Sequence, residues 1–459
     1  MMKIIMKIKV LAFMLCAVTN LSFAQKTVFN IKYSEQLAVF VFLQNLSESY
    51  PDNVFKTEFQ KSKYNTEEFQ KLATEFDKLS LDYSYKFEEF PEGSKKPMQS
   101  IDFLRKNLIE TKNLKDFKVR SIGIVTNKTL NDLTRIIAAF TPIYNELIYN
   151  PNKEKFEKQL IEITKYANEN DIEKYFETGL VFYNSSWDTS IPFEIAFYPL
   201  PNSKGFTANS FDNNFISAIQ TDLTDYKDLF SVMLHETYHI IYNEQPLELK
   251  KVIDRSFKES KSKCSNYAYH LLNEALATSL ANGYVYEKLN GKADSGDWYN
   301  KKYINLMAKE IYPMLNEYLS QKKAIDGKFI DRYIEIYETK FPNWIDEMDN
   351  LMAYRYVISE NEKDFDVIKQ KYRYRSRSED ETEISINALE KMRKSSLTKM
   401  IIVSKNNNEN LKLIKSSFKE LKNWKFNAAK EFDYKILLED KSQLFIINQK
   451  ESTLKALLD

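Results

Sequence analysis

The sequence predicts a mainly α protein with a small antiparallel β-sheet, an α+β fold, and three observations lead to this class. Apolar residues recur over most of the chain at the i, i+3, i+4 spacing of helices that bury one face. Glycine is scarce, at 8 of 459 residues, while aromatic residues make up 14%, which favours helices with aromatic packing between them. Short aromatic and β-branched runs separated by turn residues are concentrated between residues 180 and 220, where a small sheet is expected.

Length and charge limit the classes of function. A chain of 459 residues can form two or three domains. Its 66 basic and 65 acidic residues leave a formal charge of +1, so the charge balance indicates neither a nucleic-acid partner nor an anionic membrane surface. The sequence also contains no Gly-x-x-x-x-Gly-Lys-Ser/Thr phosphate loop. We therefore expect no nucleic acid among the partners.

The amino terminus has the pattern of a signal peptide spanning residues 1–24. Three lysines precede the apolar run Val10–Val18, and the small residues Ser22 and Ala24 follow at the spacing of a cleavage site. An uncleaved membrane anchor is the alternative, but the run is about half as long as a bilayer requires. We therefore expect cleavage after Ala24, no stable membrane insertion afterwards, and a periplasmic or secreted location.

Residues 25–118 are expected to form an N-terminal helical lobe. Within it, apolar periodicity predicts helices at residues 36–44, 66–79 and 100–108.

Residues 119–290 form the predicted central core, in which the apolar period changes from that of helices to that of strands. A strand at 119–125 is followed by helices at 130–149 and 153–168, and then by strands at 180–183, 193–198 and 215–220. We expect these last three strands to form the small antiparallel sheet. Its outer strand would then be free to pair with an extended peptide.

The stretch that follows the sheet contains the motif His-Glu-x-x-His. On a helix, His235 and His239 lie one turn apart, so their imidazoles can converge on one zinc ion. Glu236 lies beside the metal, where it can take a proton from a metal-bound water. A chance match on an ordinary helix is the alternative, but the chain has only 3 histidines, and two of them fall in this motif.

A second helix is predicted at residues 265–290, with Gly291 as its stop. Glu274 on this helix could reach the metal, because neighbouring alanines allow close approach to another helix. The alternative is a surface glutamate. His270 lies one turn before Glu274 on the same face, so it is a candidate donor to the developing oxyanion or a substitute ligand, with a hydrogen-bonded structural histidine as the default.

Cys264 is the only cysteine that remains after removal of the predicted signal peptide, so no intramolecular disulfide can form. A nucleophilic cysteine needs a nearby base, and His270 is the only histidine outside the motif. We therefore expect an inert or partly exposed thiol.

The remainder of the chain is predicted in three parts. Residues 291–372 form a C-terminal helical lobe with helices at 297–319, 328–340 and 344–358, residues 373–398 form a solvated linker, and residues 399–459 form a small α/β appendage. The linker is predicted from its switch from basic to acidic residues with few apolar ones; partner binding is the alternative for that stretch.

The pairing of His-Glu-x-x-His with a downstream Asn-Glu helix resembles the gluzincin metallopeptidases, the group that includes thermolysin. The resemblance implies a zincin-like catalytic core, with Glu274 as the third ligand of one zinc ion per chain. The chain differs from thermolysin in having a longer interval before Glu274. It also has Thr278 where thermolysin-like enzymes have an aspartate that orients the first histidine. Tyr284 is a further candidate oxyanion donor, since several gluzincins use a tyrosine.

The expected function is an exported zinc-dependent metallopeptidase with a peptide or protein substrate. Glu236 acts in it as general base toward a zinc-activated water, with His270 as a second catalytic candidate. The alternative is a non-catalytic extracytoplasmic binding or scaffold protein that retains a zincin fold.

Overall fold

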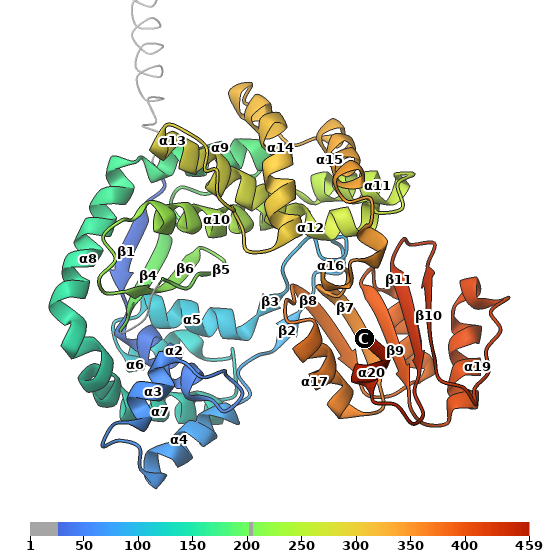
Figure 1. The fold of residues 1–459 in the computed structure, drawn as a ribbon. Helices are drawn as coiled ribbons and strands as arrows, with labels where there is room; N and C mark the ends of the chain where they lie inside the picture. Colours follow the sequence, from blue (N-terminus) through green and yellow to red (C-terminus); the bar gives the residue numbers. More distant parts are fainter. Residues whose placement is uncertain (1–25, 202–204, 459) are drawn as a thin grey trace, which may run out of the picture. The chain divides into compact units, whose positions relative to one another are not determined.

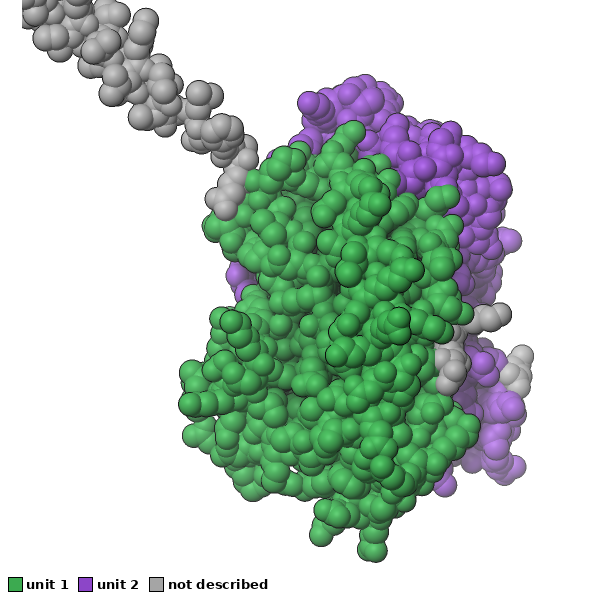
Figure 2. Space-filling view, turned by 90° about the vertical axis from the view of Figure 1, so that its left-hand side faces the viewer, with its two compact units in different colours: residues 1–85, 98–180, 186–240 green, residues 86–97, 181–185, 241–459 purple. Residues whose placement is uncertain are grey.

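The computed structural model describes residues 26–201 and 205–458 and confirms the α+β class, with helices predominating over small mixed sheets. The predicted signal peptide, residues 1–24, lies outside the described residues. Residue contacts divide the chain into two compact units (Figure 2). Unit 1 comprises residues 1–85, 98–180 and 186–240, and unit 2 comprises residues 86–97, 181–185 and 241–459.

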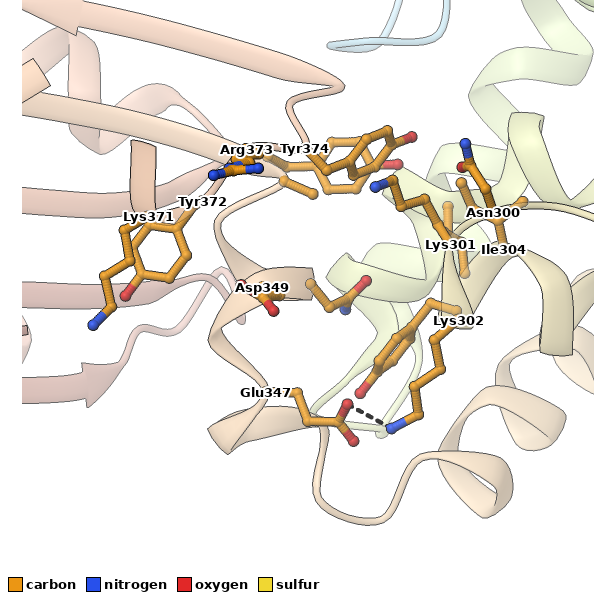
Figure 3. Close-up of a pocket in the computed structure, with 15 residues that line it drawn as sticks. Asn300, Lys301, Lys302, Ile304, Glu347, Asp349, Lys371, Tyr372, Arg373 and Tyr374 are labelled. Carbon is orange, nitrogen blue, oxygen red and sulfur yellow. Dashed lines mark hydrogen bonds and ion pairs between the residues drawn. The ribbon is translucent and has the colours of Figure 1, made fainter. Parts of the chain in front are cut away.

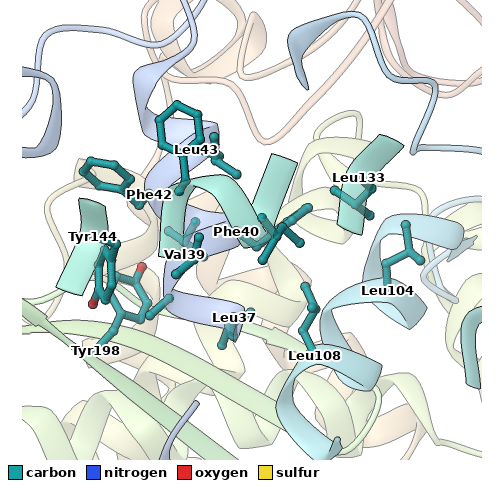
Figure 4. Packing of buried hydrophobic residues seen from close by; sticks show 14 of the residues in the cluster. Leu37, Val39, Phe40, Phe42, Leu43, Leu104, Leu108, Leu133, Tyr144 and Tyr198 are labelled. Carbon is teal, nitrogen blue, oxygen red and sulfur yellow. The ribbon is translucent and has the colours of Figure 1, made fainter. Parts of the chain in front are cut away.

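The helical part of unit 1 includes most of the predicted N-terminal lobe, residues 25–118, whereas residues 86–97 of that lobe belong to unit 2. Its elements are α2 (Glu35–Leu46), α3 (Val54–Gln60), α4 (Glu67–Asp77), the short strands β2 (Ser84–Tyr85) and β3 (Met98–Gln99), α5 (Ser100–Glu110), α6 (Leu114–Ser121) and α7 (Asn127–Tyr144). Helix α2 is buried on nearly every side from Gln36 to Leu43 and packs against α7 and α5, as the side chains in Figure 4 show. The three helices predicted for this lobe correspond to α2, α4 and α5.

The strand expected at 119–125 is wrong, because this stretch continues a helix. Asn113 caps α6 by accepting a hydrogen bond from the backbone N–H of Asp116, which favours helix initiation. Phe117 and Ser121 are both buried at the spacing of one helical turn. Only an isolated bridge between Ile122 and Val125 follows.

The strand expected at 180–183 is also wrong, since these residues form the last turn of a helix. After α7 the chain continues as a π-helical turn (Asn145–Tyr149), α8 (Asn150–Glu169) and α9 (Ile172–Tyr183). A run of four aromatic and aliphatic residues has no period of its own, so it fits a helix as well as a strand.

The sheet of unit 1 is mixed, which corrects the antiparallel sheet expected from the sequence. Its strands are β1 (Phe29–Tyr33), β4 (Phe193–Leu200), β5 (Asn209–Phe211) and β6 (Asn214–Gln220), in the order β1-β4-β6-β5 (Figure 1). β1, β4 and β6 are parallel, and only β5 and β6 form an antiparallel hairpin. The chain returns across the sheet between β4 and β6, so both strands start from the same end. β1 was not expected at all.

Helix α10 (Lys227–Asn243) carries the His-Glu-x-x-His motif and packs on α8 and α9 within unit 1. The ring of Phe230 meets Tyr166 at 5.7 Å and Tyr175 at 6.1 Å between centroids. The hydroxyl of Tyr238 donates to the backbone carbonyl of Tyr175 at 3.1 Å. These contacts hold the apolar face of α10 and fix the direction of its polar groups.

Unit 2 begins with a helical part that confirms the long helix predicted at 265–290. Its elements are α11 (Leu247–Glu259), α12 (Ser265–Thr278), a π-helical segment η2 (Ser279–Val285), α13 (Tyr286–Asn290), α14 (Lys302–Ser320) and α15 (Gly327–Lys340). The run from α12 to α13 ends at Gly291, which adopts the left-handed conformation (φ 74°) that glycine accommodates at a helix end.

The rest of unit 2 is a five-stranded α/β part. Its elements are η3 (Trp344–Asp346), α16 (Met348–Leu351), β7 (Tyr354–Ser359), α17 (Glu362–Lys371), β8 (Arg377–Glu381), α18 (Ile386–Lys394), β9 (Thr398–Val403), α19 (Asn407–Ser417), η4 (Lys419–Leu421), β10 (Phe432–Leu437), β11 (Gln443–Asn448) and α20 (Leu454–Leu458). The strand order is β10-β11-β9-β7-β8, and only β10 pairs antiparallel.

Two expectations for this part are wrong. The helix predicted at 344–358 is short helical turns followed by β7, and the linker predicted at 373–398 contains β8 and α18. β8 lies at the sheet edge, where backbone pairing with β7 holds it without an apolar sequence. The α/β part therefore begins near residue 353 instead of 399.

Both faces of this second sheet are buried. Tyr356 and Ile358 of β7 belong to one apolar cluster, shared with α18 and α19, while Val357 belongs to another, shared with α17 and α20. A sheet covered on both faces explains why its central strands are almost continuously apolar. Within residues 26–201 and 205–458, no helix is both long and apolar enough for a membrane span.

Candidate metal centre

The two histidines of the motif point at each other from one side of α10. Their Nε2 atoms lie 3.0 Å apart, and the ring planes are nearly perpendicular at 88°. His235 is 7% exposed and His239 is half-buried. Both ring nitrogens thus converge on one small region, as the helical spacing predicts.

Glu236 points to a different neighbour. The hydroxyl of Ser210, on the edge strand β5, donates to Oε2 of Glu236 at 2.7 Å. The edge strand and α10 therefore meet at the residue that was assigned the role of general base. Ser210 was missed in the sequence, although it stands in the hairpin Asn209–Asn214, directly before the strand that leads to the motif.

Glu274 completes a group of three possible ligands. His235, His239 and Glu274 are the one group among the described residues that could hold a metal ion. A tetrahedral zinc with bonds of ~2.0–2.1 Å places its ligand nitrogens roughly 3.3 Å apart. The observed 3.0 Å between the imidazole nitrogens is close to that spacing, and the chemistry of the donor set suits zinc.

The long interval before Glu274 has a structural cause. Helix α11 (Leu247–Glu259) is inserted between the helix of the motif and α12. It is strongly amphipathic and packs against α12 and α15, so it belongs to the core of unit 2.

His270 is not in the ligand group. Its Nε2 donates to the backbone carbonyl of Ser396 at 3.1 Å, and its ring stacks on Tyr354 at 4.8 Å between centroids. Burial lowers the pKa of His270 to about 4, so the ring is neutral near pH 7. These contacts correspond to the structural histidine that the sequence left open as the default.

Thr278 and Tyr284 were two further candidates for supporting roles. The hydroxyl of Thr278 is buried and makes no hydrogen bond within the part of the chain that the structure describes. It therefore gives no support to an orienting contact of the thermolysin type. Tyr284 lies in η2, and burial raises the pKa of its phenol, so it stays a hydrogen-bond donor at neutral pH.

Cys264 is buried and lies beside the hydroxyl of Ser262, with 3.0 Å between Sγ and Oγ. Burial raises the pKa of this thiol to about 11. A thiol that stays protonated is a poor nucleophile, in agreement with the inert cysteine expected from the sequence.

Comparison with protein-family models, with curated proteins and with solved structures finds no match to this chain. The gluzincin resemblance therefore depends on the residues of the motif and on Glu274 alone, and it stays a prediction.

Proposed function

We propose that this chain is an exported zinc-dependent metallopeptidase that hydrolyses peptide bonds. The observation that carries the proposal is the arrangement on α10, where two imidazole nitrogens converge at 3.0 Å and the intervening Glu236 is held by Ser210. A structural metal site needs only ligands, whereas a hydrolytic site also needs a base. The group formed with Glu274 adds a third ligand of the right chemistry.

Each residue of the site has a separate role in the proposed reaction. Zinc, when bound, supplies a Lewis acid that polarises a carbonyl and makes water more acidic. Glu236 accepts a proton from the attacking water and passes it to the leaving amine. Ser210 donates to Oε2 of Glu236, which holds the carboxylate in one orientation and leaves Oε1 for the proton. The two imidazoles, whose Nε2 atoms lie 3.0 Å apart, would bind the metal.

Hydrolysis of a mixed peptide library by the purified protein tests the proposal. We expect turnover that a chelator abolishes and zinc restores. A protein that binds one zinc per chain and cuts no peptide would instead be a binding or scaffold protein that retains the metal site, and the peptidase proposal would be wrong.

The substitution Glu236→Gln tests the role of the general base separately from that of the metal ligands. Gln keeps the size of the side chain and an acceptor for Ser210 but cannot take up a proton, so hydrolysis should fall by roughly 10²- to 10⁴-fold. Zinc content and the urea unfolding midpoint should stay near those of the wild type. Glu248→Gln, on an exposed side chain of α11, is the matched control and should leave the rate unchanged. Near wild-type hydrolysis by Glu236→Gln would show that Glu236 is not the general base and would contradict the proposed mechanism.

A further inference from the structure

Unit 2 contains a cavity with a volume of ≈ 380 Å³ that is lined by none of the candidate metal ligands (Figure 3). It is bounded by the start of α14, by α16, by the first residue of β7 and by residues 371–374 after α17. This volume falls in the range of sites for small ligands or for one or two residues of a peptide.

The charges around the cavity are not balanced. Lys302 pairs with Glu347 at 2.7 Å, and Nζ of Lys371 donates to the backbone carbonyl of Leu458 at 2.8 Å. Of the other charged residues that line the cavity, Lys301 and Arg373 are basic and Asp349 is acidic. The cavity therefore favours an anion over a cation.

An aromatic ring holds one of the two basic groups, Lys301, in place. The ammonium of Lys301 lies 4.8 Å from the centroid of the Tyr374 ring, and Figure 3 shows Arg373 next to Tyr374 on the same side of the cavity. A guanidinium can bind a carboxylate through two parallel hydrogen bonds, and an ammonium adds a point charge. Together they form a site suited to a carboxylate.

The cavity also adjoins the helix that carries Glu274. Leu271 lines it and precedes Glu274 by three residues, so both lie on one face of α12. Tyr354 and Tyr374 line it as well; burial is the first cause of the raised pKa of each phenol, and the charge of Glu274 adds to both. The Glu274 carboxylate is thus near two tyrosines of the cavity wall.

From this geometry we infer that the cavity binds a carboxylate of the peptide substrate, through Arg373 and Lys301. This inference depends on the proposed peptidase function, because the position beside Glu274 is what selects a peptide as the occupant. The carboxylate can belong to an acidic side chain or to a free C-terminus, since both present the same anion.

Paired peptides separate the two sources. One pair differs by Glu against Gln at a single position near the cleaved bond, and the other by a free against an amidated C-terminus. A charged hydrogen bond gives roughly 10- to 100-fold in kcat/KM, so we expect a preference of that size in one of the two pairs. Cleavage of all four peptides at equal rates would overturn the inference and leave the peptidase function standing.

Substitutions in the cavity then test whether the preference for the carboxylate-bearing peptide arises there. Arg373→Gln and Lys301→Gln should each reduce it by roughly ten-fold or more while the neutral member of the pair is cut at the wild-type rate. Lys328→Gln, at an exposed position of α15, removes one positive charge from the same unit away from the cavity and should change nothing. A preference that survives both substitutions would overturn the assignment to this cavity.

Binding provides a readout that does not require turnover. The acidic member of the preferred pair, labelled with a fluorophore, is titrated into Glu236→Gln protein with and without zinc. We expect binding that Arg373→Gln weakens by roughly ten-fold or more. If binding depends on Arg373 but the wild-type protein hydrolyses no peptide, the carboxylate site is supported and the peptidase proposal is wrong. If binding does not depend on Arg373, the proposed carboxylate site is wrong.

Discussion

Glu274 is the single residue on which the identity of the metal site depends most. Two histidines alone bind zinc weakly, and a third protein ligand is what distinguishes a catalytic zinc site from a chance pair. His235, His239 and Glu274 could together hold a metal ion, and the role of Glu274 as the third ligand stays a prediction from the resemblance.

Glu274→Ala should lower zinc affinity by roughly ten-fold or more, because even the loss of a residue that only supports a ligand has effects of that size. Titration of zinc against a competing chelator measures it, with Glu248→Ala as the control on an exposed glutamate of the same unit. Unchanged affinity would remove Glu274 from the ligands. His270 would not be the replacement, since its Nε2 is engaged with Ser396.

His270 should make the stability of the protein depend on pH. Its pKa is lowered to about 4 in the folded chain against an ordinary value of 6.5, so between these values the unfolded chain binds the proton and the folded chain does not. Stability therefore rises with pH in this window and is lost on acidification. From pH 7 to pH 5 the loss from this group is roughly 2 kcal/mol.

His270→Gln removes this dependence because Gln can still donate to the Ser396 carbonyl but does not titrate. Urea unfolding at pH 7 and pH 5 should show a smaller loss of unfolding free energy for the variant than for the wild type. An equal loss in both proteins would mean that His270 is charged in the folded state, and its structural role would then need revision.

At the scale of residues, the sequence predicted what local spacing controls. His235, Glu236 and His239 could be assigned because a helix brings residues four apart onto one face. Ser210 could not, since its contact with Glu236 depends on how the edge strand β5 packs beside α10. The hydrogen-bond partner of His270 could not be predicted either, because Ser396 follows it by more than a hundred residues in the chain.

Among the elements, the π-helical segment η2 directly follows the helix that carries Glu274. Gly283 lies in it, and a Cβ built on this residue would come within 2.8 Å of the ring of Trp298. The backbone of the segment thus packs directly on an aromatic side chain, which explains why a helix-destabilising glycine occurs in a helical run.

Gly283→Ala should therefore lower the free energy of unfolding by about 1–3 kcal/mol, the usual cost of an added methyl in a packed interior. Urea unfolding measures it. Gly327→Ala is the matched control, since Gly327 begins α15 and its added Cβ meets only the Ser256 hydroxyl at 3.9 Å. The control should be as stable as the wild type or slightly more so. An equal effect of both substitutions would contradict the close packing of η2.

Two strands that were missed in the sequence, β8 and β1, are both held by pairing with other strands. β8 is polar and was taken for a linker, but its backbone pairs with β7 along the whole strand. β1 does alternate apolar and polar residues from Phe29 to Tyr33 and was overlooked in the sequence; it is held by parallel pairing with β4, far away in the sequence. Long amphipathic helices such as α7 and α8 were predictable because their periodicity is a property of their own residues.

At the scale of the whole molecule, the C-terminal α/β part is integrated with the helices of unit 2. The hydroxyl of Tyr267, on α12, accepts a hydrogen bond from the backbone N–H of Gln443 at 2.9 Å and lies 3.2 Å from the hydroxyl of Thr398. Lys441 donates to the backbone carbonyls of Phe257 and Lys258 at the end of α11. An appendage that folds independently would share few such bonds with its neighbour.

A chain that ends after residue 352 should therefore fail to fold cooperatively in unit 2, although the sequence suggested a separable appendage. The truncation uncovers Tyr267 and the other buried residues of α12, and it removes the carbonyl of Ser396 that holds Asn266 and His270. We expect exposed apolar surface detected by dye binding and loss of zinc affinity, since Glu274 lies on the same helix.

Tyr267→Phe in the full chain is a milder test of the same contacts. It leaves the Gln443 N–H buried without its acceptor and should lower the unfolding free energy by about 1–3 kcal/mol. A truncated chain that binds zinc with wild-type affinity and unfolds cooperatively would show that the α/β part is dispensable for holding α12 in place.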